Sequence, residues 1–529
     1  MNRSKSNLNT YYQALIDQGG LRKIRATKQS VIEMELNSLG EMDDDRKIKE
    51  KELAFIQKKI SYLFNSRMYA KIAVNNYRNK KNSLLIPPSW YRHFCLHAFE
   101  IDSFISRLKW TVFLLLLSAK SVFQGLYNAF KIENYLLNRF IVNHKRDKNR
   151  IIILNSKFPT GDLFNGKKSL DFGAWYLKQV KRDAQLNFVY FSSESKNYEV
   201  NYNERRLKCI SFKKFDFGIS YKQKIKLIFF AIKLLIKGLL LLIIGKCETL
   251  VGYLELIIAK RFSLVCVKEL PDKIVFSDNH GVLMPIWVNE LKKSGVQVDY
   301  IFFSSYDSPT VYDAEDPRQD FWKLNSWPKI ICVDQYQADF MNKNLVYKDQ
   351  KVEIGGFPLF SDCDLNIPVF DRFTISLFDF EPGKDHLGIS TISECGYNTF
   401  EVNENFMSTV YEIAQELDAV ILHKPKRRSN LENRSTKYKK FIKSLDPQHY
   451  ISLAPEVSAA RLILNSNSTI SMPISTPSLI ANYYGKKSLY FDPLGKVMQS
   501  DPALRGIPLA GDPTQLRNIL IQMKKEWAG

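Results

Sequence analysis

Residues 459–493 carry the pattern that most constrains the fold of this 529-residue chain. They read as an apolar strand ending at Met472, a turn rich in hydroxyl side chains, an apolar helix closed by Gly485, and a second buried strand. Strand, helix and strand in succession form the unit of a parallel α/β sheet, which binds its ligands where the strands end. The turn therefore predicts an anion site built from backbone N–H groups and a helix N-terminus. The alternative is a plain helix cap, with Pro477 in the first helical turn.

The same alternation fills most of the chain after residue 149. Buried strands are predicted at 151–154, 187–191, 273–277, 296–303, 330–333, 373–378 and 418–423. The polar segment 361–368 divides these strands into two groups and is the predicted linker. We therefore predict an α/β protein with two Rossmann-like domains, residues 150–365 and 366–529, after an α-helical region over residues 1–149.

The helical region contains two apolar patterns. Leu53, Ile56, Ile60 and Leu63 repeat at near-heptad spacing, in a stripe too short for a stable coiled coil. The stripe predicts packing as an antiparallel hairpin or on a partner, so self-association through these helices is one expectation. A second helix, over residues 104–117, has an uncharged core too short to span a bilayer. A helix lying on a membrane surface and a buried core helix both fit this second pattern.

An amphipathic insertion is predicted at residues 221–262. Its first helix places Lys222, Lys226, Lys233 and Lys237 within a stripe about 60° wide, while Leu, Ile and Phe fill most of the remaining circumference. Lysines are costly at a bilayer centre, so we expect this helix to lie in a membrane interface and meet anionic headgroups. The alternative is a core helix hairpin whose lysines face water.

The charge balance restricts the partners and the compartment. A net charge of +21 predicts an acidic partner, such as nucleic acid, anionic lipid or a phosphorylated substrate. No nucleic-acid module is recognisable and the basic residues interleave with Leu- and Ile-rich helices, so we expect no nucleic-acid partner. Seven cysteines without a CxxC pair predict reduced thiols, and the polar N-terminus has no signal-peptide pattern. We therefore predict a cytoplasmic protein held peripherally on the inner face of the plasma membrane.

Polar clusters follow the predicted strands in both domains. In the first domain the candidate site residues are Asp162, Asp278, His280 and Asp307. The alternative is that they are ordinary polar turn residues. In the second domain they are Asp379, Glu381, His423, Lys424, Lys426, Arg427 and Arg428, followed by the turn hydroxyls of Ser471, Ser475, Thr476 and Ser478. Because parallel strands end at one edge of a sheet, the cationic run and the hydroxyl turn together predict a phosphate site. An exposed basic loop is the alternative for the cationic run.

Several segments of the chain are similar to one bacterial protein family. They are NSWPKIICVDQYQADF (325–340), SLFDFEP (376–382), HKPKRR (423–428), ISMPISTPSLIA (470–481), SLYFDPLG (488–495) and RGIPLAGD (505–512). Together they resemble the polysaccharide-biosynthesis proteins named for a PFTS motif, from about residue 273 to the C-terminus. The signature itself differs, since Pro473-Ile474-Ser475-Thr476 stands where Pro-Phe-Thr-Ser is usual.

The resemblance implies two Rossmann-like domains in a GT-B arrangement and a glycosyltransferase activity. A nucleotide sugar would bind the second domain, and a glycan or lipid-linked glycan acceptor would bind the first. The transfer would need no metal and no cofactor, because cationic side chains and backbone N–H groups would meet the charge on the leaving phosphate. The groups expected there are Lys424, Lys426, Arg427, Arg428 and the N–H groups near Ser475 and Thr476.

The same resemblance implies roles for the carboxylates. Asp379 or Glu381 would contact the donor or the acceptor hydroxyl. The general base of an inverting transfer would come from the acceptor side, where the candidates are Asp162, Asp278, His280 and Asp307. Asp278 and His280 are preferred because they directly follow a strand. Two alternatives stay open: a phosphotransferase that builds polyol-phosphate polymers, and a non-catalytic membrane scaffold.

Overall fold

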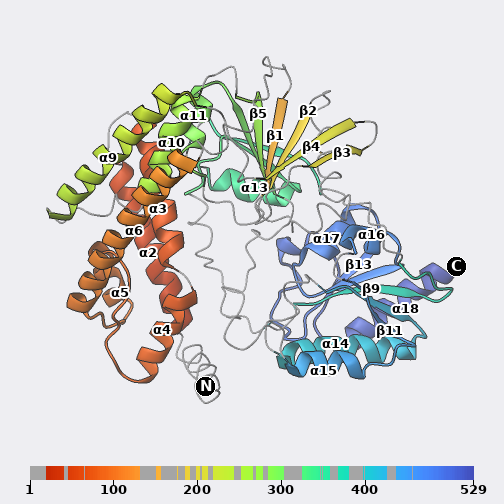
Figure 1. Cartoon of the computed structure of the whole chain (residues 1–529). Coiled ribbons are helices and arrows are strands. Elements are labelled where there is room, and N and C mark those ends of the chain that lie inside the picture. The colour runs from red at the N-terminus through yellow and green to blue at the C-terminus, as the bar shows by residue number, and fades with distance from the viewer. Residues whose placement is uncertain are drawn as a thin grey trace.

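The described chain consists of two sheets and a group of N-terminal helices (Figure 1). The structure is a computed structural model. It describes residues 20–40, 46–64, 66–131, 150–155, 176, 185–190, 198–202, 205–211, 219–243, 252–265, 270–277, 284–302, 324–345, 347, 349–357, 367–380, 397, 400–425, 436–454 and 457–529.

The first sheet has eight strands in the order β3-β4-β2-β1-β5-β6-β7-β8. The strands are β1 (Arg150–Asn155), β2 (Gln185–Tyr190), β3 (Tyr198–Tyr202), β4 (Arg205–Ser211), β5 (Lys273–Ser277), β6 (Gln297–Ile301), β7 (Lys329–Cys332) and β8 (Lys351–Ile354). All neighbouring strands run parallel except β3 and β4. Because β1 lies between β2 and β5, the strand order reverses at β1 and β5, as in a doubly wound Rossmann sheet.

The second sheet has six parallel strands in the order β11-β10-β9-β12-β13-β14. They are β9 (Thr374–Phe378), β10 (Val420–His423), β11 (Tyr450–Ser452), β12 (Ser468–Ser471), β13 (Lys487–Phe491) and β14 (Leu509–Ala510). This is the strand order 3-2-1-4-5-6 of the Rossmann fold, with the reversal between β9 and β12. β9, β10 and β12 are buried at every position, as expected for parallel strands covered by helices on both faces.

Helices connect or follow these strands. In the first unit they are α10 (Tyr253–Leu264), α11 (Val288–Lys293) and α13 (Gln335–Lys343), and in the second α14 (Phe400–Glu416), α15 (Thr436–Ser444), α16 (Ala459–Leu464), α17 (Thr476–Tyr483) and α18 (Pro513–Ala528). The predicted fold class, an α/β protein with two Rossmann-like units after a helical region, is confirmed.

One predicted element is wrong. The segment that begins at residue 459 was expected to be a strand, but Ala459–Leu464 forms α16, and β12 begins only at Ser468. The Ser458 side chain accepts a hydrogen bond from the Arg461 N–H at 3.4 Å and so caps the helix. A six-residue apolar run has too few positions to separate a helical from a strand period, which explains the error.

The N-terminal region is helical in its described parts, with α2 (Gly20–Gly40), α3 (Arg46–Leu63), α4 (Ser66–Tyr77), η1 (Pro88–Trp90), α5 (Tyr91–Leu96) and α6 (Ser103–Lys131). The near-heptad stripe of α3 is buried within this chain, because Leu53, Ile56, Ile60 and Leu63 belong to a large apolar core that also includes side chains of the first sheet. Packing inside the chain therefore accounts for the stripe.

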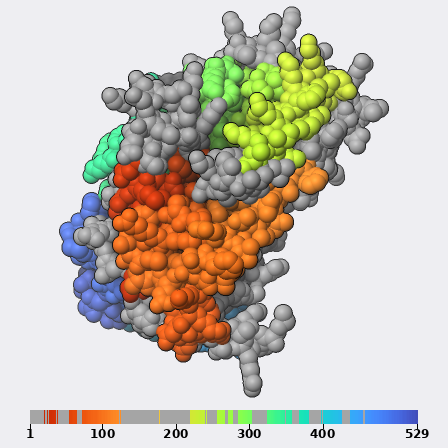
Figure 2. Space-filling model, turned by 90° about the vertical axis from the view of Figure 1, so that its left-hand side faces the viewer, coloured from red at the N-terminus to blue at the C-terminus, as the bar shows by residue number. Residues whose placement is uncertain are grey.

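The long helix α9 (Tyr221–Ile243) packs beside α6, and α10 contacts both. Figure 2 shows α9 in yellow-green and the segment that contains α6 in orange on the same face of the molecule. Each helix is buried on one side only: Trp110 and Leu114 of α6 and Leu227 of α9 are at most 2% exposed. Within the described ranges, the chain has no helix with the length and apolar character needed to cross a membrane.

The two sheets are joined by direct contacts. Phe357, which follows β8, lies in the same buried cluster as Leu479 of α17, Tyr490 of β13 and Leu504. The hydroxyl of Tyr484 also donates a hydrogen bond to the Phe357 carbonyl at 3.0 Å. The carboxyl end of α17 is therefore fixed against the chain that leaves the first sheet.

Candidate active site

Three strand ends meet at the reversal point of the second sheet. β9 pairs with β10 on one side and with β12 on the other, which places Leu377 opposite His423 and Phe378 opposite Ser471. Asp379 is the first residue after β9. In a doubly wound sheet, ligands bind outside the carboxyl ends of the two strands at which the order reverses. The strand pairing thus brings three predicted site residues, Asp379, His423 and Ser471, to this edge.

Asp379 is the centre of a buried polar cluster. One oxygen of its carboxylate, Oδ1, lies 3.2 Å from His423 Nε2, and the other, Oδ2, accepts a short hydrogen bond from the Tyr438 hydroxyl. The second ring nitrogen of His423, Nδ1, lies 2.5 Å from the Tyr450 hydroxyl. The four residues are between 1% and 9% exposed, and the side chains of Asp379 and His423 are each only 1% exposed. Burial of a carboxylate is costly unless hydrogen bonds compensate it, and these two partners do so.

The His423 side chain is buried at the carboxyl end of β10. Both of its ring nitrogens face protein groups, and the side chain is 1% exposed. In this arrangement His423 orients Asp379, while a direct contact of His423 with a donor stays a prediction. Tyr438 of α15 and Tyr450 of β11 were not predicted from the sequence. Isolated tyrosines, one on a short amphipathic helix and one at a strand start, carry no pattern that would have indicated them.

The hydroxyl turn lies between β12 and α17. Ser475 occupies the N-cap position and Pro477 the first turn of α17, as the helix-cap alternative predicted. The Ser475 hydroxyl, however, donates to the Met472 carbonyl at 2.9 Å and makes no capping hydrogen bond. Simple side-chain capping is therefore not what the Ser475 hydroxyl does.

The other two turn serines are internal. The hydroxyls of Ser471 and Ser478 lie 2.6 Å apart, and Ser478 also donates to the Leu489 carbonyl at 3.1 Å. Both side chains are fully buried, so in this structure they tie α17 to β12 and β13. Of the predicted hydroxyls, Ser475 and Thr476 are the partly exposed ones.

Backbone strain marks the same turn. Ile474 has φ +58°, in the left-handed region that a β-branched side chain rarely adopts. Such a conformation costs on the order of 1–3 kcal/mol and persists only where the surroundings impose it. Ile474 is half-buried against the apolar core between the two sheets, which holds the turn in this shape.

The remaining predicted site residues are mostly outside the described chain. Lys424 is described; it is half-buried and donates to the Pro425 carbonyl at 3.0 Å. Those outside the described residues are Asp162, Asp278, His280, Asp307, Glu381, Lys426, Arg427 and Arg428. β5 ends at Ser277, one residue before Asp278, and β5 is a strand at which the order of the first sheet reverses. Within the described ranges, no three His, Cys, Asp or Glu side chains are grouped so that they could hold a metal ion.

A further buried carboxylate follows β13 and was not predicted. Asp492 accepts hydrogen bonds from the Tyr397 hydroxyl at 2.6 Å and from the backbone N–H groups of Leu494 and Val497 at 3.0 and 2.8 Å. It is fully buried. These bonds fix the chain after β13 beside the hydroxyl turn.

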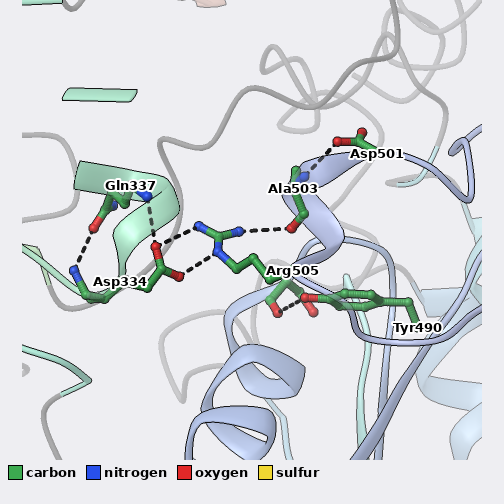
Figure 3. A network of polar contacts seen from close by, with 8 residues as sticks. Asp334, Gln337, Tyr490, Asp501, Ala503 and Arg505 are labelled. Atoms are coloured by element: carbon green, nitrogen blue, oxygen red, sulfur yellow. Dashed lines mark hydrogen bonds and ion pairs between the residues drawn. The ribbon is translucent and has the colours of Figure 1, made fainter. Parts of the chain in front are cut away.

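An ion pair joins the two sheets close to this edge (Figure 3). Arg505 Nε lies 2.5 Å from Asp334 Oδ2, and the Arg505 guanidinium lies 4.5 Å from the centroid of the Tyr336 ring. Asp334 is also the N-cap of α13, where it accepts from the Gln337 N–H at 2.8 Å.

The second sheet connects this ion pair to the hydroxyl turn. Tyr490 of β13 donates to the Ser475 carbonyl at 3.3 Å, and burial raises the pKa of Tyr490 well above its usual value, so its hydroxyl stays protonated. Tyr490 lies close enough to both Arg505 and Asp334 for their charges to act on its pKa. Tyr490 therefore lies between the interdomain ion pair and the hydroxyl turn.

Comparison with known families identifies the group of proteins to which the chain belongs. The family model described as polysaccharide biosynthesis PFTS motif protein matches residues 237–520, which is more than half of the chain. The chain belongs to this family. In this PFTS motif protein, the match covers β5 through β14 and thus both the interdomain ion pair and the sheet edge described above. No curated protein matches the chain.

Solved structures that are similar to this chain include an epimerase and a synthase. UDP-GlcNAc 2-epimerase from Methanocaldococcus jannaschii is 10% identical, with a TM-score of 0.38 over 71% of this chain and 92% of that one. α,α-Trehalose 6-phosphate synthase from Burkholderia multivorans is 8% identical, with a TM-score of 0.38 over 71% of this chain and 90% of that one. The fold of this PFTS motif protein is defined by its own two strand orders.

Proposed function

We propose that this PFTS motif protein is a glycosyltransferase that transfers a sugar from a nucleotide-sugar donor to a lipid-linked or cell-surface polysaccharide acceptor. The observation that carries the proposal is the meeting of Asp379, His423 and the Ser475 turn at the reversal point of a 3-2-1-4-5-6 sheet. A second support is membership of a polysaccharide-biosynthesis family.

The donor phosphates are assigned to the turn and the basic run. Ser475 and Thr476 begin α17, whose first-turn N–H groups and helix dipole favour an anion. Lys424 follows β10, and Lys426, Arg427 and Arg428 follow it in the sequence. Cations and N–H groups preorganised at the leaving phosphate would stabilise the charge that develops there, without any metal ion.

Asp379 is assigned to a hydroxyl of the donor or acceptor. Its carboxylate is held on one side by His423 and on the other by Tyr438. Because the carboxylate is already oriented, substrate binding does not have to restrict its rotation. Glu381 shares this assignment, and Asp162, Asp278 and His280 are the proposed candidates for the general base on the first domain. Transfer takes place at the inner face of the plasma membrane, where a lipid-linked acceptor would be reached.

A thermal-shift panel of UDP, GDP, CMP and CDP compounds tests the proposal. Specific stabilisation by one nucleotide-sugar class is expected, since a ligand present at about 100 times its Kd stabilises the folded protein by about 2.7 kcal/mol. The shift should persist in EDTA. Stabilisation only by CDP-activated polyols would favour the phosphotransferase alternative, and no stabilisation by any compound would favour the non-catalytic scaffold.

A further inference from the structure

Helices α6 and α9 expose an unusual amount of apolar surface. Of the 21 large apolar side chains that are exposed in the described ranges, seven belong to α6 and six to α9. The most exposed include Phe104 (77%), Leu116 (67%) and Phe123 (73%) on α6, and Phe229 (69%), Ile236 (56%) and Leu240 (57%) on α9. Because the two helices pack against each other, their outer sides form one surface, the α6–α9 face. A monomer rarely leaves so much apolar surface in water.

The side of α9 opposite the α6–α9 face is packed against the rest of the protein. Leu227, Ala231 and Leu234 of α9 are buried at one side of the helix, opposite the exposed apolar stripe. At about 100° per residue, that exposed stripe of α9 spans about 100° and the four exposed lysines occupy about the next 60°. The lysines therefore lie beside the apolar stripe and leave it uninterrupted. The exposed stripe of α6 also contains no charged residue between Leu108 and Ala119 except Lys109, which is turned to the Ser83 hydroxyl at 2.7 Å.

The charge of the α6–α9 face indicates which partner binds it. Neither helix contains an acidic residue, while α9 exposes Lys222, Lys226, Lys233 and Lys237. A second copy of this chain would bring the same positive charges against them and be repelled. An anionic lipid bilayer offers both an apolar layer for the exposed stripe and negative headgroups for the lysines beside it.

We infer that the α6–α9 face is the docking surface for an anionic lipid bilayer. Both helices lie in the plane of the interface, with their apolar stripes at the boundary of headgroups and acyl chains and the α9 lysines at the headgroup phosphates. The inference rests on the membrane location in the proposed function and names the surface responsible for it. It joins the interfacial helix predicted for α9 and the membrane-surface alternative left open for α6 into one two-helix surface.

Vesicle co-sedimentation of the full-length protein tests this inference. Vesicles that contain phosphatidylglycerol should bind the protein, and vesicles of phosphatidylcholine alone should bind it much more weakly. The double variant Lys226→Gln/Lys233→Gln should weaken binding to the anionic vesicles roughly 30-fold, since each lysine near an anionic surface contributes about one factor of five. The double variant Leu116→Ser/Phe229→Ser, which removes apolar contact from both helices, should weaken it at least about tenfold.

Matched controls separate this surface from general effects of charge and hydrophobicity. Lys440→Gln changes an exposed lysine on α15, and Val369→Ser changes an apolar side chain that is 91% exposed outside the α6–α9 face. Both should bind vesicles like the unmodified protein. All variants should keep the nucleotide-induced thermal shift, so a failure of docking is distinguishable from a failure of the donor site. Equal binding to the two kinds of vesicle, or normal binding by both double variants, would overturn the inference. A dimer in solution that Phe229→Ser dissociates would assign the face to a second copy instead.

Discussion

Arg505 and Asp334 connect the two sheets through an ion pair at 2.5 Å, and the Asp334 carboxylate caps helix α13 at the same time. The two side chains are 10% and 21% exposed, so solvent screens the pair only partly. Arg505 has φ +54°, a strained backbone conformation for an arginine. The structure thus holds the guanidinium at a cost in backbone energy, in a place where it bridges the sheets.

Removing this ion pair should loosen the contact between the sheets. Asn caps a helix as well as Asp does, so Asp334→Asn keeps the cap and removes the charge. We expect a coupling free energy of about 1–3 kcal/mol between Asp334→Asn and Arg505→Gln, because neighbouring charges do not act additively. A double-mutant cycle on denaturant unfolding measures it. A coupling free energy near zero would show that the pair does not stabilise the interdomain contact.

The hydrogen bond from Tyr438 to Asp379 should contribute more to the free energy of unfolding than a hydrogen bond of a surface tyrosine does. Tyr438→Phe leaves a buried carboxylate oxygen with one partner fewer, which should lower the free energy of unfolding by about 1–3 kcal/mol. The control is Tyr411→Phe on α14, whose hydroxyl accepts hydrogen bonds at an exposed site. Denaturant unfolding of both variants provides the measurement. Equal losses in the two would argue that Asp379 is not held by Tyr438.

Gly356 should tolerate no side chain, for two separate reasons. Its φ is +79°, and a Cβ atom there would lie 2.3 Å from the Tyr483 hydroxyl. Gly485 has φ +67° but no atom within 4 Å of such a Cβ, so Gly485→Ala carries only the backbone cost, on the order of 1 kcal/mol. Gly356→Ala should therefore lower the melting temperature more than Gly485→Ala does.

A second variant isolates the steric part at Gly356. Tyr483→Phe removes the hydroxyl that a Cβ would meet, so adding it to Gly356→Ala should restore part of the lost stability. The backbone cost and a 3.0 Å contact between the Cβ and the ring atom Cζ of residue 483 would remain. If Tyr483→Phe gave no recovery, close packing of α17 against the chain after β8 would not be the cause of the loss.

Lys71 should titrate far below an ordinary lysine. Partial burial, and then the neighbouring Lys109, lower its pKa to about 8; both ammonium groups face the Ser83 carbonyl, at 2.6 and 3.2 Å. The unfolded chain, with a lysine pKa near 10.5, binds more protons between these values, so this group makes stability rise with pH from about 8 to about 10.5. Nuclear magnetic resonance of ¹³C-methylated lysines would follow Lys71 directly. Lys109→Met should raise its pKa without fully restoring it, whereas titration of Lys71 above pH 10 in the unmodified protein would refute the prediction.

The sequence predicted the elements whose patterns are long or bounded by clear signals. β5 and β13 begin and end where the apolar runs do, and Asp334 before α13 is a recognisable N-cap. The polar side chains of Asp379, His423 and Ser475 follow predicted parallel strands, so their gathering at one edge of a sheet was also predictable. The strand orders were not predicted, nor were β3, β4, β11 and β14.

The contacts between distant segments were not predictable. Tyr438 reaches Asp379 from 59 positions away, and Arg505 reaches Asp334 from 171 positions away. No local period or spacing encodes such pairs. The positive φ of Ile474 was also unexpected, because the sequence gives no sign that a β-branched residue will adopt it. Burial of Ser471 and Ser478 likewise depends on how α17 packs on β12 and β13.

In the proposed function, the Ser475 turn and Lys424 bind a nucleotide-sugar donor. Calorimetric titration of the stabilising nucleotide sugar into Ser475→Ala, Lys424→Ala and the unmodified protein tests it most directly. Ser444→Ala is the matched control, because the Ser444 hydroxyl donates to the carbonyl three residues earlier, as the Ser475 hydroxyl does, but at an exposed site on α15. We expect Kd to rise at least about tenfold, or roughly 1.4 kcal/mol, in both site variants and to be unchanged in Ser444→Ala. Unchanged affinity in both site variants, with folding intact, would contradict it.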